Sequence, residues 1–159
     1  MPAFSGITRA LFDAKYTETA DLAAPSAPIS IVKPITWTSG NANRFYEETI
    51  TLAATSVNRD LFGSLTDIYG NTISLVTLRA LLIVNKSTTA TDVLTVSGNF
   101  IATVLLSGTT PTLKLGPGGI LYVTNDTDGY VVTATTADVI TIDSGADTFD
   151  VDFVFIGVQ

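Results

Sequence analysis

The segment that most constrains the fold is 149–156, near the C-terminus. Side chains of a β-strand alternate between two faces. One face of this segment would hold only large apolar side chains, namely Phe149, Val151, Phe153 and Phe155. The other face changes from acidic at Asp150 and Asp152 to apolar at Val154 and Ile156. Such a strand begins half-exposed and ends covered on both sides, which predicts a central strand of a packed β-sandwich or barrel.

The chain from Phe45 onward predicts further strands at a spacing of roughly eight to twelve residues, which is typical of an all-β sandwich or barrel. Turn segments rich in Gly, Asn, Asp and Pro separate them. The expected strands are 49–52, 73–75, 78–84, 93–96, 101–106, 112–115, 120–124, 130–135, 139–142 and 149–156. Residues 58–69 are expected to form a helical turn or an ordered loop, with Leu61, Leu65 and Ile68 on one side.

The first 44 residues differ from the rest and predict an extended N-terminal arm before a β-sandwich domain at 45–159. Residues 7–16 could form a short helix. The prolines that follow oppose a helix and favour extended chain, with short strands at 29–31 and 35–38. Two interpretations stay open: a frayed leader with one edge strand, or an arm that docks on a neighbouring subunit or partner.

The apolar content of the arm favours docking. Ordering the backbone costs roughly 1–2 kcal/mol per residue, so an ordered arm of this length needs a large docking surface. Apolar side chains are also denser here than in a solvated tail. The candidate partner-binding residues are Phe4, Leu11, Phe12, Tyr16, Ile29, Ile31 and Trp37.

Composition supports an ordered β protein and disfavours two classes of partner. Hydrophobic residues make up 46% of the chain and charged residues 14%, and there are 26 threonines. The net charge of −7 disfavours nucleic acid and anionic membrane, which require clustered Lys and Arg. The charge is uneven, since all four arginines precede residue 80 and eight aspartates follow Leu81. This pattern indicates either solubility or two halves that face different neighbours.

The residue types exclude several kinds of chemistry. There is no Cys and no His, so a disulfide, a Cys nucleophile and a His-based triad are impossible. The adjacent Glu47 and Glu48 would point to opposite faces of a strand, which rules out the facing carboxylates of a glycosidase. The glycine-rich segment 116–119 precedes a predicted strand and lacks the Lys and helix of a phosphate loop. We therefore expect no catalytic residue, no cofactor and no enzymatic activity.

Two groups of polar residues suggest calcium, and each has a simpler interpretation. Residues 125–129 resemble a calcium loop, but Thr124 and Thr135 stand where ligands would be required, so an Asp–Gly hairpin turn is the better prediction. The second group could bind calcium through loop oxygens or be solvated strand ends, and comprises Asp143, Asp147, Asp150 and Asp152. No metal site is predicted.

The aromatic residues suggest a sugar-binding platform as one alternative. Trp37 together with a tyrosine could stack on a sugar, although single aromatics in a β protein more often pack in the core or at an edge; the tyrosines considered are Tyr46, Tyr69, Tyr122 and Tyr130. Arg9, Asp13 and Lys15 interrupt any apolar core of a signal peptide. No apolar run approaches the ~20 residues of a membrane span. We expect synthesis in a host cytoplasm.

One set of turn-and-strand motifs resembles a known class of protein. The motifs are the sequences of 65–75, 82–85, 115–119, 129–133, 138–142 and 153–157, which read LTDIYGNTISL, LIVN, LGPGG, GYVVT, DVITI and FVFIG. They resemble small β-sandwich virion proteins of tailed bacteriophages, of the head decoration or cement type. The resemblance covers roughly residues 50–157 and excludes the arm.

This resemblance implies a jelly-roll-like fold that binds the outer face of a capsid and stabilises the shell. It implies the major capsid protein as partner, a symmetric homo-oligomer with a trimer ahead of a dimer, and a location on the virion surface. The arm would then supply contacts between subunits. The alternative is a phage tail or receptor-binding β-sandwich module that recognises a cell-surface glycan.

Overall fold

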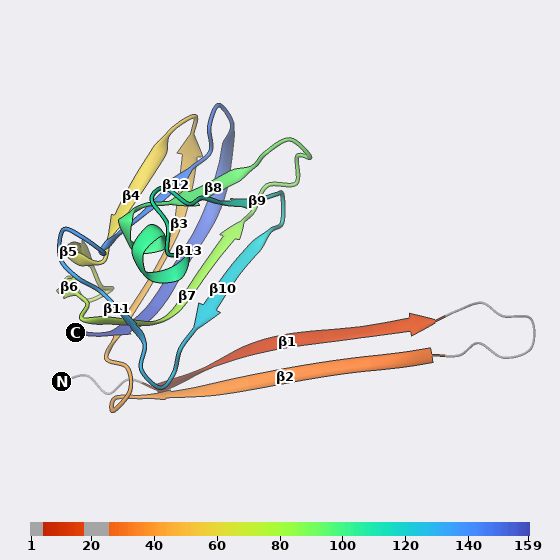
Figure 1. Ribbon diagram of the computed structural model, residues 1–159, viewed down its shortest axis with the longest axis horizontal. Coiled ribbons are helices and arrows are strands. Elements are labelled where there is room, and N and C mark those ends of the chain that lie inside the picture. The colour runs from red at the N-terminus through yellow and green to blue at the C-terminus, as the bar shows by residue number, and fades with distance from the viewer. Residues whose placement is uncertain (1–4, 18–25) are drawn as a thin grey trace, which may run out of the picture. The chain divides into compact units, whose positions relative to one another are not determined.

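The computed structural model describes residues 5–17 and 26–159 of the chain. The chain divides into two compact units, Met1–Ser39 and Gly40–Gln159. Figure 1 labels their elements. All sheets of the described residues are antiparallel, and these residues are all-β apart from one short helix.

The first unit is a two-stranded ribbon formed by β1 (Ser5–Thr17) and β2 (Ser26–Thr38). Its antiparallel register is unbroken from Ser5 opposite Thr38 to Thr17 opposite Ser26. The short helix expected at 7–16 is therefore wrong. Prolines keep β2 extended. The backbone N–H and C=O groups of β1 form their hydrogen bonds with β2 instead of within a helix.

The two prolines of β2 are compatible with this ribbon. Pro28 lies opposite Lys15 and Pro34 lies opposite Arg9. They are six residues apart, so both occupy the same type of position in the ladder and both missing N–H groups can fall on the outer edge. The short strands expected at 29–31 and 35–38 are thus parts of one longer strand.

The second unit contains one helix and the remaining strands. The five-stranded sheet has the order β10-β7-β13-β3 with β11 beside β7, the four-stranded sheet has the order β4-β12-β8-β9, and β5 pairs with β6. The bounds are β3 (Arg44–Ala53), β4 (Ser56–Asp60), β5 (Phe62–Thr66), β6 (Thr72–Ser74), β7 (Thr77–Asn85), β8 (Leu94–Ser97), η1 (Ile101–Leu105), β9 (Leu113–Leu115), β10 (Ile120–Thr124), β11 (Tyr130–Val131), β12 (Val139–Asp143) and β13 (Thr148–Val158).

The pairing of the longer strands is nested. Within the two larger sheets, β3 pairs with β13, β4 with β12, β7 with β10 and β8 with β9. Of these eight strands in chain order, the first thus pairs with the last, the second with the seventh, the third with the sixth and the fourth with the fifth. Two further pairings, β13 with β7 and β12 with β8, join these pairs into sheets.

One hydrophobic core contains side chains from both larger sheets. The five-stranded sheet contributes Ile50, Leu52, Leu81, Ile83, Phe149, Val151, Phe153 and Phe155, and the four-stranded sheet contributes Leu94, Val96, Ile140 and Ile142. β13 lies between β7 and β3, and the alternating residues from Phe149 to Phe155 are buried as predicted. The prediction of a central strand at 149–156 is confirmed.

Two predictions of local structure are wrong. Residues 58–69, expected as a helical turn or loop, contain parts of β4 and β5 followed by a turn in which Gly70 N–H donates to Asp67 O. Residues 101–106, expected as a strand, contain the π-helix η1, in which Leu106 N–H donates to Ile101 O. A short apolar run without alternation does not separate helix from strand.

The Asp–Gly hairpin turn predicted at 125–129 is also wrong. β10 and β11 do not pair with each other, because both pair with β7. Residues 125–129 therefore form a loop that connects two strands, β10 and β11, that both pair with β7. Among residues 5–17 and 26–159, no helix is long and apolar enough to cross a membrane.

Candidate interaction surface

The β1–β2 ribbon presents large apolar side chains to solvent. The exposed fractions are 59% for Ile7, 65% for Leu11, 51% for Ile29, 62% for Ile31 and 53% for Val32. Buried apolar side chains are what normally hold a sheet together, and an isolated two-stranded ribbon is marginally stable. Exposed apolar surface of this kind makes the ribbon a candidate interaction surface.

The register divides the ribbon into two different faces. Directly opposed residues share a face, and every second residue along a strand returns to it. The described side chains of one face, hereafter the Lys33 face, are Thr8, Ala10, Ala14, Ile29, Ile31, Lys33, Ile35 and Trp37. The other face has Ile7, Leu11 and Val32 interspersed with Arg9, Asp13 and Ser30. Lys33 is the one charged side chain described on its face.

The Lys33 face changes in exposure along the ribbon. Ala10, Ala14, Ile29 and Ile31 are exposed, whereas Ile35 and Trp37 are buried. Trp37 Nε1 donates a hydrogen bond of 3.0 Å to Thr8 Oγ1 across the two strands, which satisfies the indole donor. Trp37 is therefore unsuited to a sugar platform, since a stacking ring must expose one flat side.

The outer face of the five-stranded sheet is also apolar at its centre. The register places Glu47, Val154, Leu82 and Tyr122 in one row across the four main strands. The next row holds Thr49, Asp152, Val84 and Ile120. Leu82, Val84 and Val154 are partly exposed, lie outside the hydrophobic core, and adjoin Ile120, which is 63% exposed. An antiparallel sheet with one face in water usually alternates to polar residues there, so this face also has the composition of a contact surface.

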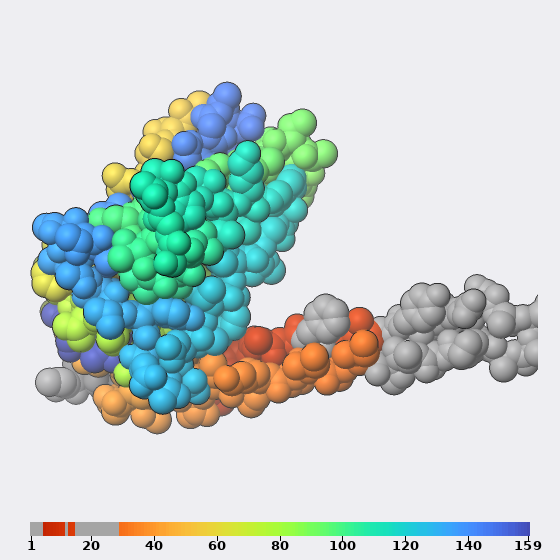
Figure 2. All heavy atoms as spheres, viewed as in Figure 1, coloured from red at the N-terminus to blue at the C-terminus, as the bar shows by residue number. Residues whose placement is uncertain are grey.

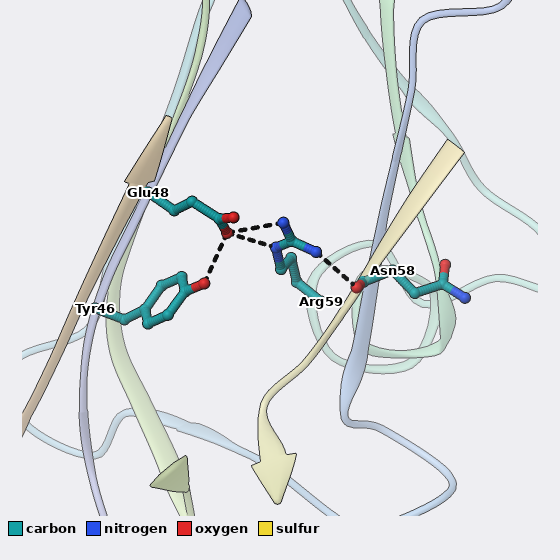
Figure 3. A network of polar contacts seen from close by, with 4 residues as sticks. All are labelled: Tyr46, Glu48, Asn58 and Arg59. Carbon is teal, nitrogen blue, oxygen red and sulfur yellow. Dashed lines mark hydrogen bonds and ion pairs between the residues drawn. The ribbon is translucent and has the colours of Figure 1, made fainter. Parts of the chain in front are cut away.

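A polar network lies at the edge of the second unit (Figure 3). Tyr46 OH donates to Glu48 Oε2 at 2.7 Å, and Arg59 Nε and Nη2 both lie 2.8 Å from the same oxygen. Burial, the hydrogen bond to Glu48 and the negative charge of Glu48 raise the pKa of Tyr46 to about 12. The Tyr46 ring stacks on Phe155 at 5.1 Å, so the network is structural and this tyrosine is unsuited to a sugar platform.

Glu47 and Glu48 point to opposite faces, as predicted. Glu48 lies opposite Phe153 and faces the core side, whereas Glu47 lies opposite Val154 and is exposed. The pair cannot form facing carboxylates. The glycine-rich segment 116–119 precedes β10, a strand, also as predicted.

The loop at 125–129 already holds a cation from the protein. Arg79 Nη1 lies 2.6 Å from Thr127 O and 3.4 Å from Asp126 O. Asn125 closes the loop by donating from Nδ2 to Gly129 O. Two backbone carbonyl oxygens of the loop thus accept from the guanidinium of Arg79.

Three of the four aspartates after residue 142 have partners for their carboxylates on the protein. Asp150 and Asp152 accept hydrogen bonds from Thr51 and Thr49, and Asp152 also pairs with Lys86 at 3.2 Å. Asp143 accepts from Gly145 N–H. In the part of the chain that the structure describes, no group of three or more carboxylates could hold a metal ion.

A cleft of about 470 Å³ lies beside η1. It is lined by Ser97, Gly98, Asn99, Ala102, Thr109, Thr110, Pro111, Thr112 and Thr141. Figure 2 shows η1 and the residues after it on the surface of the second unit. Asn99 donates to Thr135 O and Asp138 Oδ1 and accepts from the N–H groups of Asp138 and Val139, so its amide is already satisfied.

Comparison of the chain with protein-family models, curated proteins and solved structures found no match.

The structure places the predicted partner-binding residues unevenly. Leu11, Ile29 and Ile31 are exposed on the ribbon, and Trp37 is buried. Phe4 lies outside the described residues, and Phe12 and Tyr16 belong to β1, opposite Ile31 and Ala27, without described side chains. Sequence reasoning missed Ile7, Val32 and Lys33. The alternation of apolar residues from Ile29 to Trp37 was a signal for the Lys33 face.

Proposed function

We propose that Gly40–Gln159 is a jelly-roll β-sandwich. The nested pairing supports this, because a ribbon that pairs first strand with last and then folds over gives two four-stranded sheets. Those sheets correspond to β10-β7-β13-β3 and β4-β12-β8-β9. The shared core of both sheets is the second support. Eight-stranded jelly rolls with two Greek keys occur in viral capsid and lectin domains.

The proposed role of the chain is that of a structural virion protein, a decoration or cement subunit that binds and stabilises a phage capsid shell. The major capsid protein is the proposed partner and the capsid surface the proposed location. The observation that carries this is the exposed apolar surface of the β1–β2 ribbon, with Leu11 and Ile31 each more than 60% exposed. The sequence motifs of 65–157 resemble such proteins, and the proposal assigns no catalytic residue.

Energetics support a partner for the ribbon. Covering an exposed aliphatic side chain completely contributes roughly 1.5–3 kcal/mol. Five such side chains on the ribbon would contribute up to roughly 8–15 kcal/mol, which offsets a part of the roughly 1–2 kcal/mol per residue lost when its backbone is ordered. Repetition over many sites of a shell would then give strong retention from modest single contacts. A homo-oligomer, with a trimer ahead of a dimer, fits the same surface.

The test is sedimentation of the full-length chain with empty shells assembled from the major capsid protein of the phage that carries this gene. Saturable binding with a fixed number of chains per capsid subunit is expected. Shells that sediment without the chain at every concentration would refute the capsid role.

The second candidate is a module that binds a cell-surface glycan, and the threonine-lined cleft favours it. Its hydroxyl groups could hydrogen-bond a sugar, and jelly rolls include lectin domains. A glycan array probed with the intact chain separates the two functions. Specific binding that is lost in Thr110→Val, with shell binding absent, would support the glycan function.

A further inference from the structure

The exposed part of the Lys33 face is a flat apolar surface with one cation. Lys33 lies opposite Ala10 and is flanked along β2 by Ile31 and Ile35. Both Lys33 and Ala10 are exposed. A face of this composition requires a partner that is apolar and has a carboxylate at one position.

The outer face of the five-stranded sheet has the complementary composition. Glu47 is exposed on the edge strand β3, at the end of the row that continues through Val154, Leu82 and Tyr122. The neighbouring carboxylate, Asp152, is already paired with Lys86. Across residues 5–17 and 26–159, neither Glu47 nor Lys33 belongs to an ion pair.

Net charge favours the same pairing. The sequence of β1 and β2 contains three cations, Arg9, Lys15 and Lys33, against one carboxylate, Asp13, and Met1–Ser39 as a whole is neutral once Glu18 and Asp21 are counted. Gly40–Gln159 contains five cations and twelve carboxylates, which gives a net charge of −7. The Gly40–Gln159 units of two copies therefore repel each other. The positively charged strands β1 and β2 of one copy are attracted to the Gly40–Gln159 unit of another.

We propose that the Lys33 face of one copy docks on the outer face of the five-stranded sheet of a second copy, with Lys33 beside Glu47 of that copy. The contact is then a packing of sheet on sheet, for which the usual separation is about 10 Å. The ribbon is exchanged between copies. The inference deepens the proposed function, since it names the surface through which the homo-oligomer of that function forms.

Charge reversal in the full-length chain tests this exchange. Lys33→Glu places two carboxylates together, and Glu47→Lys places two ammonium groups together. Each single variant should weaken self-association roughly tenfold. The double variant Lys33→Glu/Glu47→Lys should recover the wild-type association, which also shows that the chain still folds.

Mixing the two single variants identifies which chain the ribbon contacts. The Lys33→Glu ribbon matches the Glu47→Lys sheet, and the unchanged Lys33 of the second variant matches the unchanged Glu47 of the first. An even-numbered assembly of alternating variants therefore regains every contact, and a trimer regains two of three. Light scattering on the separate variants and on their mixture is the measurement.

Recovery of the oligomer on mixing supports the exchange. Recovery in the double variant alone, with none on mixing, would mean that the ribbon docks on its own chain and would overturn it. Single variants that associate like the wild type would also overturn it. Shell sedimentation is measured separately. If the wild type binds shells but shows no exchange of the ribbon, only this inference is rejected. If the ribbon is exchanged but the chain does not bind shells, only the capsid role is rejected.

Discussion

Arg59 on β4 and Glu48 on β3 join the edge strands of the two larger sheets. Two nitrogens of the guanidinium, Nε and Nη2, lie 2.8 Å from one carboxylate oxygen, and Tyr46 OH donates to that same oxygen. β3 and β4 are consecutive in the chain and lie at the edges of different sheets. The network therefore fixes the place where the chain passes from one sheet to the other.

Removing the cation of this network should destabilise the second unit. The Arg59 side chain is 15% exposed and that of Glu48 is 34% exposed, so Arg59→Ala leaves a partly buried carboxylate without its cation. We expect the free energy of unfolding to fall by about 1–3 kcal/mol. Urea unfolding measures it.

The matched control is Lys86→Ala, which breaks the more exposed pair with Asp152. Exposed pairs contribute about 0–1 kcal/mol. Equal losses in the two variants would contradict a structural role for the Arg59 network.

The raised pKa of Tyr46 predicts loss of stability at high pH. The pKa is about 12 in the folded protein against 10.0 for a free tyrosine, chiefly because of burial. Below pH 10 both states hold the proton, whereas between pH 10 and 12 only the folded state holds it. Raising the pH through this interval therefore favours the unfolded chain.

The measurement compares the wild type with Tyr46→Phe by urea unfolding at a series of pH values. The stability difference between them should change only above pH 10, with the wild type losing more. Tyr69→Phe, at a side chain that is 74% exposed, is the control: it keeps Tyr46 and should lose stability with pH as the wild type does. If the free energy of unfolding changed with pH in parallel for all three proteins, the raised pKa of Tyr46 would be contradicted.

Gly98 is required where β8 turns toward η1. Its φ is +104°, and an added Cβ would lie 2.3 Å from Val139 O. Gly98→Ala should therefore force the backbone of β12 to move and lower the free energy of unfolding by roughly 3 kcal/mol or more. Gly70, with φ of +81° and nothing within 4 Å, is the matched control. Gly70→Ala should cost only about 1–2 kcal/mol, and an equal loss at both sites would argue against the close contact.

The sequence predicted the central strand well and the N-terminal ribbon poorly. In β13 the alternation from Phe149 to Phe155 is strict, and each of these residues is buried. In β1 the pairs Ile7 with Ala10 and Leu11 with Ala14 have the spacing of one helical face. Their conformation is set by pairing with β2, a contact outside any local window.

The candidate surface was predictable only in part. Apolar content indicated an arm that docks, but not which side chains are exposed. Trp37 is buried, whereas Ile29 and Ile31 on the same face are exposed, so neither apolar content nor alternation decides which side chains are covered. The apolar residues of 101–106 do not alternate, so the sequence alone could not distinguish a strand from a helix there. In the structure, Phe100 and Ile101 anchor η1 in the core.

The ribbon should contribute to assembly without stabilising the second unit. Ile29→Ser together with Ile31→Ser makes the exposed Lys33 face polar and should weaken self-association at least tenfold, since each change removes about 1–2 kcal/mol of apolar contact between copies. Urea unfolding of Gly40–Gln159 within the full chain should stay unchanged. The control, Ile7→Ser together with Val32→Ser, alters the opposite face at similar exposure and should have a smaller effect. Equal effects would contradict a special role for the Lys33 face.

The most direct test of the central claim, that the ribbon joins copies of this chain, is the native mass of the purified full-length protein by light scattering on a sizing column. The account predicts one peak at three times, or else two times, the mass of a single chain, which shifts toward the single-chain mass in the Ile29→Ser/Ile31→Ser variant. A wild-type protein that elutes with the mass of one chain at every concentration would contradict it.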